Sequence, residues 1–124
     1  MSTVYNKSLV KSFGYSVEGV FHALRNNRNL RINLVVALVV IILSVFFRIN
    51  KYEMSILGVV ILIVICAEMI NTSIEEMVNL ITSEHRREAK IAKDVAAGMV
   101  LVASMGSVII GFLIFTPYVL KLFY

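Results

Sequence analysis

The sequence predicts an all-α integral membrane protein in which an N-terminal amphipathic surface helix precedes three transmembrane helices. Its 124 residues are 59% hydrophobic and only 16% charged, with a mean hydropathy of +0.86, which does not fit a soluble domain. Long uncharged runs alternate with short charged segments, and apolar residues recur at helical spacing before the first run. No repeat, linker or low-complexity tract interrupts residues 1–124, so we expect a single domain.

The surface helix is expected at about residues 5–25. Apolar and polar side chains there fall on opposite faces of a helix. The apolar face holds Val10, Phe13, Val17, Val20, Phe21 and Leu24, and the polar face holds Lys7, Lys11, Ser16 and Glu18. Such a helix lies in the membrane interface or packs on its own bundle, and both arrangements can hold at once.

Three crossings are expected at about residues 29–47, 54–79 and 92–120. The first uncharged run is slightly short for a bilayer, so its flanking residues must extend it. The second is interrupted only by Glu68, and the third has no charge from Val95 to Leu120. Small residues on the third crossing favour close packing of helices between chains, and hence a homo-oligomer, although they could also pack within one chain. These are Ala103, Ser107 and Gly111.

The basic residues indicate the orientation of the chain in the membrane. Nine Lys and Arg residues lie in the N-terminal segment and in the loop of residues 80–94, against three on the other side. We therefore expect the N-terminus in the cytoplasm and the C-terminus outside. The net charge of +4 is spread over these flanks and forms no continuous stripe, so no nucleic-acid partner is expected.

A row of polar residues crosses the second apolar run. Glu68, Asn71 and Glu75 share one helical face, which Asn79 continues toward the cytoplasmic end. An intramembrane carboxylate is costly and is a functional candidate by default. Two carboxylates about 10 Å apart along one face can divide the tasks of accepting a proton and binding a cation. The alternative is a hydrogen-bond cluster that only holds the bundle together.

A charged segment follows this row and begins the third crossing. It includes Glu84, His85, Arg86, Lys93 and Asp94. A carboxylate row facing basic residues suits a metal-bound polyphosphate, although a charged loop beside a membrane is more often simply solvated. Neither common glycine-rich nucleotide motif is present in the sequence.

These residues carry a resemblance to a known family. The stretch from Ala67 to Glu75, then Ser83-Glu84-His85 and Ala92-Lys93-Asp94, resembles the signature of the prokaryotic diacylglycerol kinases. The segment of residues 27–31 is closest to their Gram-positive undecaprenol kinase members. The segments from Ser12 to Ser16 and from Arg25 to Ile32 resemble the family's approach to its first crossing.

The resemblance implies a homotrimeric lipid kinase of the bacterial inner (plasma) membrane, with active sites shared between chains. It implies transfer of the γ-phosphate of ATP, with Mg²⁺, to a lipid alcohol, undecaprenol or diacylglycerol, at the cytoplasmic interface. Matched by position, Glu68 is the proton acceptor, Asn71 is a neighbouring catalytic group, and Glu75 is a metal ligand at the nucleotide. Further positions associated with the nucleotide are Tyr15, Glu84, His85, Arg86, Lys93 and Asp94.

Two positions depart from the family pattern. The resemblance implies a second metal ligand at position 27, where this chain has Asn27 in place of the usual Glu, and Asn79 stands where Asp is frequent. An amide oxygen ligates a cation without adding charge, so Mg²⁺ affinity falls unless Glu18, Glu76 or a water compensates.

Two other functions stay open at this point: a small proton-coupled transporter, and a catalytically weak family member that serves as an assembly subunit.

Overall fold

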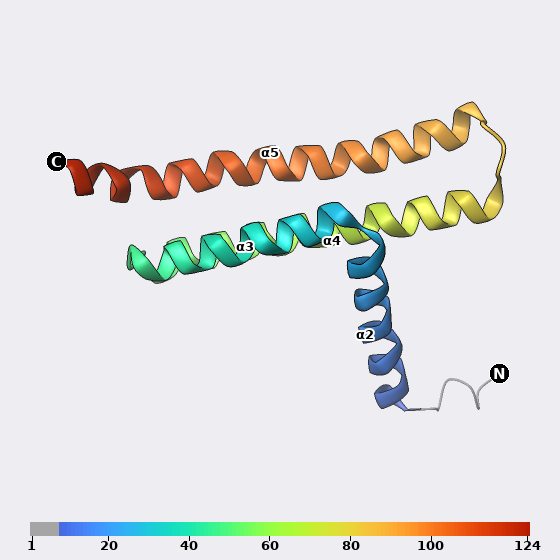
Figure 1. Ribbon diagram of the computed structural model, residues 1–124, viewed down its shortest axis with the longest axis horizontal. Helices are drawn as coiled ribbons and strands as arrows, with labels where there is room; N and C mark the ends of the chain where they lie inside the picture. Colours follow the sequence, from blue (N-terminus) through green and yellow to red (C-terminus); the bar gives the residue numbers. More distant parts are fainter. Residues whose placement is uncertain (1–7) are drawn as a thin grey trace.

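The computed structural model describes residues 8–124, which form four helices. They are α2 (Leu9–Asn26), α3 (Arg28–Phe46), α4 (Lys51–Ile81) and α5 (Arg87–Phe123). The last three are each long and apolar enough to cross a membrane, and Figure 1 shows them running lengthwise along one another. The predicted all-α fold is confirmed, because an N-terminal helix precedes three candidate membrane spans. Residues 5–7 of the expected surface helix lie outside the described residues.

The chain turns sharply at Asn27, between α2 and α3. The backbone of Asn27 is extended (φ −113°, ψ 103°), its N–H donates to the Ala23 carbonyl, and its side-chain oxygen accepts from the Leu30 N–H at 3.0 Å. One residue therefore ends α2 and caps α3. Because no loop separates the two helices, α2 leaves the bundle at a steep angle (Figure 1), as a helix lying along a membrane surface would.

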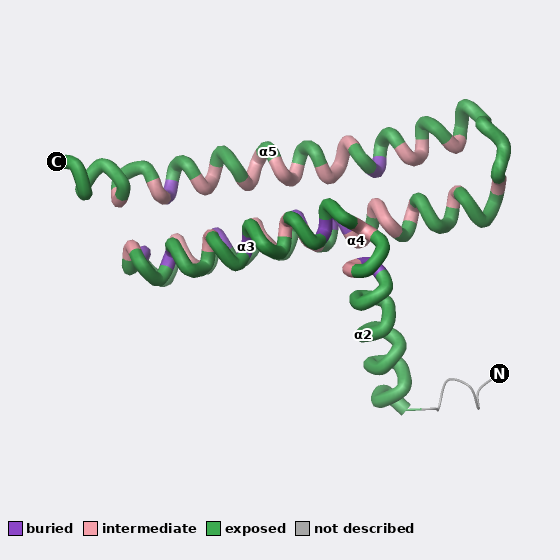
Figure 2. Tube along the Cα trace, in the orientation of Figure 1, coloured by how far each residue is buried: buried purple, intermediate pink, exposed green. Residues whose placement is uncertain are grey.

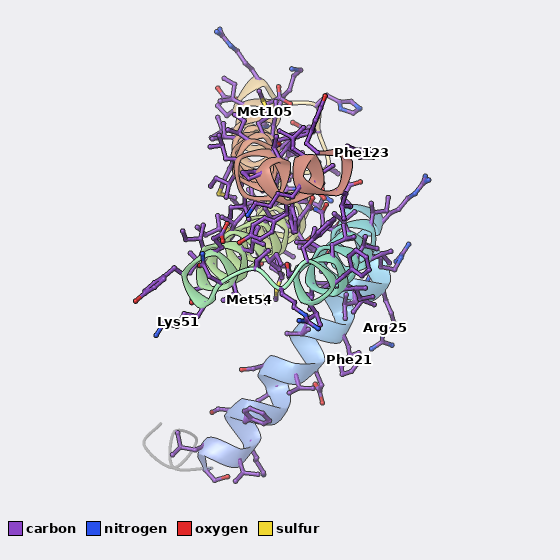
Figure 3. The ribbon with its side chains drawn as sticks, turned by 90° about the vertical axis from the view of Figure 1, so that its left-hand side faces the viewer. Phe21, Arg25, Lys51, Met54, Met105 and Phe123 are labelled. Carbon is purple, nitrogen blue, oxygen red and sulfur yellow. The ribbon has the colours of Figure 1, made fainter. Side chains whose placement is uncertain are left out.

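The apolar side chains of α2 are not packed on the bundle. Ala23 is the buried residue of this helix, while Leu9, Val10, Phe13, Val17, Val20 and Phe21 are exposed. Figure 3, in which Phe21 and Arg25 are labelled, shows α2 projecting away from the other helices. Of the two interpretations of its apolar face, this arrangement favours contact with the membrane interface.

The end of the bundle remote from α2 is fixed by a short turn and a small core. Asn50 and Glu53 form a reciprocal capping box at the start of α4. The Tyr118 hydroxyl of α5 donates to the Glu53 carboxylate at 2.5 Å, and Phe47 packs against the Tyr118 ring. These contacts set the register of the three spans.

The spans leave much apolar surface uncovered (Figure 2). Within residues 8–124, α4 contacts both α3 and α5, whereas α3 and α5 share no close backbone contact. A groove of about 660 Å³ lies between them, and its lining includes Asn33, Ser107 and Gly111. A Cβ added at Gly111 would meet no atom within 4 Å. Ser107 and Gly111 of the small-residue stripe thus line an unfilled groove in the single chain, and the predicted homotrimer stays a prediction.

Candidate active site

Glu68 is the only charged residue that is buried within residues 8–124, and it is 1% exposed. It lies on α4, beside the junction between α2 and α3 at Asn27. A buried carboxylate is costly unless its oxygens are hydrogen-bonded. Here both oxygens accept such bonds, and both donors are amides of Asn residues at the beginning of α3.

The two amides take one carboxylate oxygen each. Asn27 Nδ2 donates to Glu68 Oε2 at 3.0 Å, and Asn33 Nδ2 donates to Glu68 Oε1 at 3.1 Å. An ionised carboxylate offers about four acceptor positions, so these bonds leave some of its lone pairs unused. An amide nitrogen does not release its proton at physiological pH, hence neither Asn competes with a substrate for the base.

Asn27 has further partners. Its amide nitrogen also donates to Thr72 Oγ1 at 2.8 Å, while its oxygen caps α3 at Leu30. The cap fixes which way the amide faces, because a flipped amide would present nitrogen to the Leu30 N–H. The structure therefore uses the oxygen of Asn27 as a helix cap and its nitrogen as a donor to the Glu68 carboxylate.

Asn71 and Glu75 form a second polar pair, one to two turns beyond Glu68 on the same face of α4. Asn71 Nδ2 donates to Glu75 Oε1 at 3.4 Å, and the buried Asn71 Oδ1 has no hydrogen-bond partner within residues 8–124. An unpartnered amide oxygen beside a carboxylate is the donor set that hard cations such as Mg²⁺ prefer. These two residues fit a metal ion that also binds oxygens of a phosphate. Residues 8–124 contain no cluster of three His, Cys, Asp or Glu side chains able to hold a metal without such a partner.

The basic residues expected at the nucleotide lie at the same end of the bundle. Lys93 Nζ donates to Asn79 Oδ1 at 2.8 Å, which joins α5 to the polar face of α4. Asp94, in contrast, pairs with Lys90 of its own helix at 2.6 Å. Asn79 therefore holds a lysine through a neutral acceptor, and the charge of Lys93 is not neutralised by this contact.

Glu84, His85 and Arg86 lie in the loop between α4 and α5 and are exposed. Arg86 bonds Glu84 at 3.2 Å and lines a cavity of about 370 Å³ at the end of the hairpin. Tyr15 is also exposed, on α2. It lies 12 residues before Asn27, about 18 Å along the helix axis, so the single chain does not bring it to Glu68.

Two contacts of the site were not anticipated from the sequence. Asn33 was not a candidate, although a polar Asn in a mostly apolar run was a signal that could have identified it. Glu76, considered as a replacement metal ligand, instead faces His22 of α2 at 3.6 Å. That pair joins the surface helix to α4 beside the site.

The fold and the site define a multi-pass membrane protein with a buried carboxylate and a row of polar groups at one end of its bundle. A sequence profile described as prokaryotic diacylglycerol kinase matches residues 14–115. The chain is 38% identical over 107 residues to "Undecaprenol kinase" of Bacillus subtilis strain 168, covering 86% of this chain and 87% of that protein. It is 34% identical over 116 residues to "Diacylglycerol kinase" of a Synechocystis species, covering 93% of this chain and 66% of that protein.

The chain belongs to the prokaryotic diacylglycerol kinase family, and it is a membrane lipid kinase. The resemblance inferred from the sequence is thereby confirmed. Membership in a kinase family argues against the transporter alternative. The matched residues include Asn27, Glu68, Asn71, Glu75 and Lys93, so the whole polar face of α4 lies inside the region shared with the family.

Proposed function

We propose that this protein transfers the γ-phosphate of ATP to undecaprenol, with Glu68 as the proton acceptor. In this reaction the lipid hydroxyl oxygen bonds to the γ-phosphorus, the bond from that phosphorus to the bridging oxygen breaks, and ADP leaves. The hydroxyl proton goes to the Glu68 carboxylate. The observation that carries the proposal is the burial of this carboxylate with both oxygens held and acceptor positions left free.

The phosphates are assigned to the polar residues nearer the hairpin end of α4. Asn71 and Glu75 would hold Mg²⁺, supported by the unpartnered Asn71 oxygen beside the Glu75 carboxylate. Bound there, Mg²⁺ would neutralise charge on the phosphate oxygens and help to align the γ-phosphate. Lys93 would turn from Asn79 to phosphate oxygens. Glu84, His85, Arg86 and Asp94 from the hairpin and Tyr15 from α2 complete the proposed nucleotide site.

Undecaprenol is preferred as the substrate because of the name of the Bacillus subtilis relative and the resemblance of residues 27–31 to the Gram-positive members. Diacylglycerol is the second candidate, because the Synechocystis relative bears that name. Both lipids present one hydroxyl next to long apolar chains. The exposed apolar flanks of the three spans suit either.

We place the N-terminus, α2 and the hairpin between α4 and α5 in the cytoplasm of a bacterium, at its inner membrane. The excess of Lys and Arg on this side supports that orientation. We further propose a homotrimer. Within one chain Tyr15 lies far from Glu68, and in the trimer Tyr15 of a neighbouring chain would complete the site. The open small-residue stripe at Ser107 and Gly111 supports an interface on α5.

The experiment is phosphoryl transfer from γ-labelled ATP to lipid in reconstituted vesicles, with the products separated by thin-layer chromatography. Vesicles that contain undecaprenol should yield labelled undecaprenyl phosphate, and the yield should depend on added Mg²⁺. Label only on diacylglycerol would select the second candidate. Label on neither lipid, with the assembled protein present, would favour the catalytically weak family member.

A further inference from the structure

The first span supplies both hydrogen bonds to the buried carboxylate of the second. Asn27 caps α3, and Asn33 lies six residues later on the same helix. Their amide nitrogens contact different oxygens of Glu68, at 3.0 and 3.1 Å. Both Asn residues are partly buried, whereas the carboxylate is 1% exposed, so the amides replace water as its hydrogen-bond partners.

One donor on each oxygen restricts the plane of the carboxylate. The last torsion of a Glu side chain is otherwise broad, so a free carboxylate rotates easily. Two donors fixed to the same helix remove that freedom, because rotation would lengthen both bonds. Bonds to an ionised acceptor are stronger than neutral ones, so the restraint is substantial.

Amides orient the carboxylate without consuming its capacity as a base. A Lys or Arg at either position would neutralise the charge of Glu68, and a carboxylic acid could share its proton with it. Asn does neither. This chemistry also gives a reason for an amide at position 27 of this chain: an ionised carboxylate there could not donate to Glu68 Oε2.

We propose that Asn33, together with Asn27, is a positioning residue that holds the Glu68 carboxylate in the orientation needed to accept the lipid hydroxyl proton. The proposal rests on the proposed role of Glu68 as the proton acceptor. Misorientation of a catalytic group lowers the rate of the chemical step without changing how ATP is bound. The consequence is a defect in kcat that leaves the KM for ATP almost unchanged.

The test compares three variants of the full-length protein in vesicles containing the lipid that the wild-type protein phosphorylates. Asn33→Leu removes the donor and keeps a similar volume. Asn33→Gln keeps a neutral amide donor on a side chain that is one methylene longer. Asn29→Leu is the matched control, since Asn29 is an exposed Asn of the same helix with no side-chain hydrogen bond within residues 8–124.

We expect Asn33→Leu to lower kcat by about tenfold or more while the KM for ATP stays within about twofold. Asn33→Gln should recover part of the lost kcat, and Asn29→Leu should match the wild type. Asn33→Ala replaces the Leu variant if the latter does not assemble in size-exclusion chromatography. A kcat above half the wild-type value in the variant that lacks the donor would overturn the positioning role. An equal loss of kcat in Asn29→Leu, or a kcat of Asn33→Gln no higher than that of the variant without the donor, would also overturn it. A wild-type protein that labels no lipid alcohol would instead contradict the proposed function itself.

Discussion

Replacement of Glu68 by Gln separates the chemistry of the buried carboxylate from its structural role. Asn27 cannot turn its amide without losing the cap on Leu30, so its nitrogen must continue to donate, now to the Gln oxygen. Asn33 is not restrained in this way, because within residues 8–124 its side-chain oxygen makes no hydrogen bond. A half-turn of the Asn33 amide would let it accept from the Gln nitrogen. Both partners of residue 68 are thus retained, although as neutral bonds.

Glu68→Gln should therefore keep the fold and lose the reaction. We expect the free energy of unfolding to change by about 1 kcal/mol or less, since no buried donor is left without a partner. The rate of lipid phosphorylation should fall by at least about 100-fold, because an amide cannot accept the hydroxyl proton. The assay is label transfer from ATP to lipid, with thermal unfolding and size-exclusion chromatography of the same samples. An assembled variant that keeps more than about a tenth of the wild-type rate would refute the assignment of Glu68 as the base.

Three further variants test other parts of the site and the fold. Lys93→Ala should raise the KM for ATP more than the KM for lipid, since only ATP carries the phosphate oxygens that Lys93 would contact; a change confined to the lipid KM would remove it from the nucleotide site. Asn27→Glu should lower kcat even at saturating Mg²⁺, because a donor to Glu68 Oε2 is replaced by a second carboxylate; a lower Mg²⁺ requirement with unchanged kcat would instead assign position 27 to the metal site. Asn50→Ala should cost about 1 kcal/mol of stability in thermal unfolding and leave the KM for ATP unaltered, because it removes the cap of α4 at the end remote from the site; an unchanged unfolding temperature would show that the capping box contributes little.

The helices and their membrane class could be predicted from the sequence because hydropathy and apolar spacing are local properties. The long uncharged runs predicted the three spans, and the apolar face of residues 10–24 predicted a separate amphipathic helix. The importance of Glu68 also followed locally, since a charge inside an apolar run is costly wherever the helix packs. The structure adds that this is a carboxylate with both oxygens bonded.

The partners of Glu68 could not be predicted in the same way, because they depend on how two helices pack. Asn33 is 35 positions away from Glu68 in the sequence, and only the packing of α3 on α4 brings its amide to 3.1 Å. The resemblance implies Asn27 as a metal position, which stays a prediction. Its role as cap and donor depends on the turn between α2 and α3, which the sequence does not show. The contact of Glu76 with His22 likewise depends on where α2 leaves the bundle.

The most direct test of Glu68 as the base for undecaprenol phosphorylation compares the wild-type protein and Glu68→Gln in the same vesicles, with γ-labelled ATP and Mg²⁺. We expect labelled undecaprenyl phosphate from the wild-type protein and at least about 100-fold less from the variant, with both proteins assembled alike. Equal labelling by the two proteins would contradict the role of Glu68 as the base, and no labelling of either lipid alcohol by the wild type would contradict the proposed kinase activity.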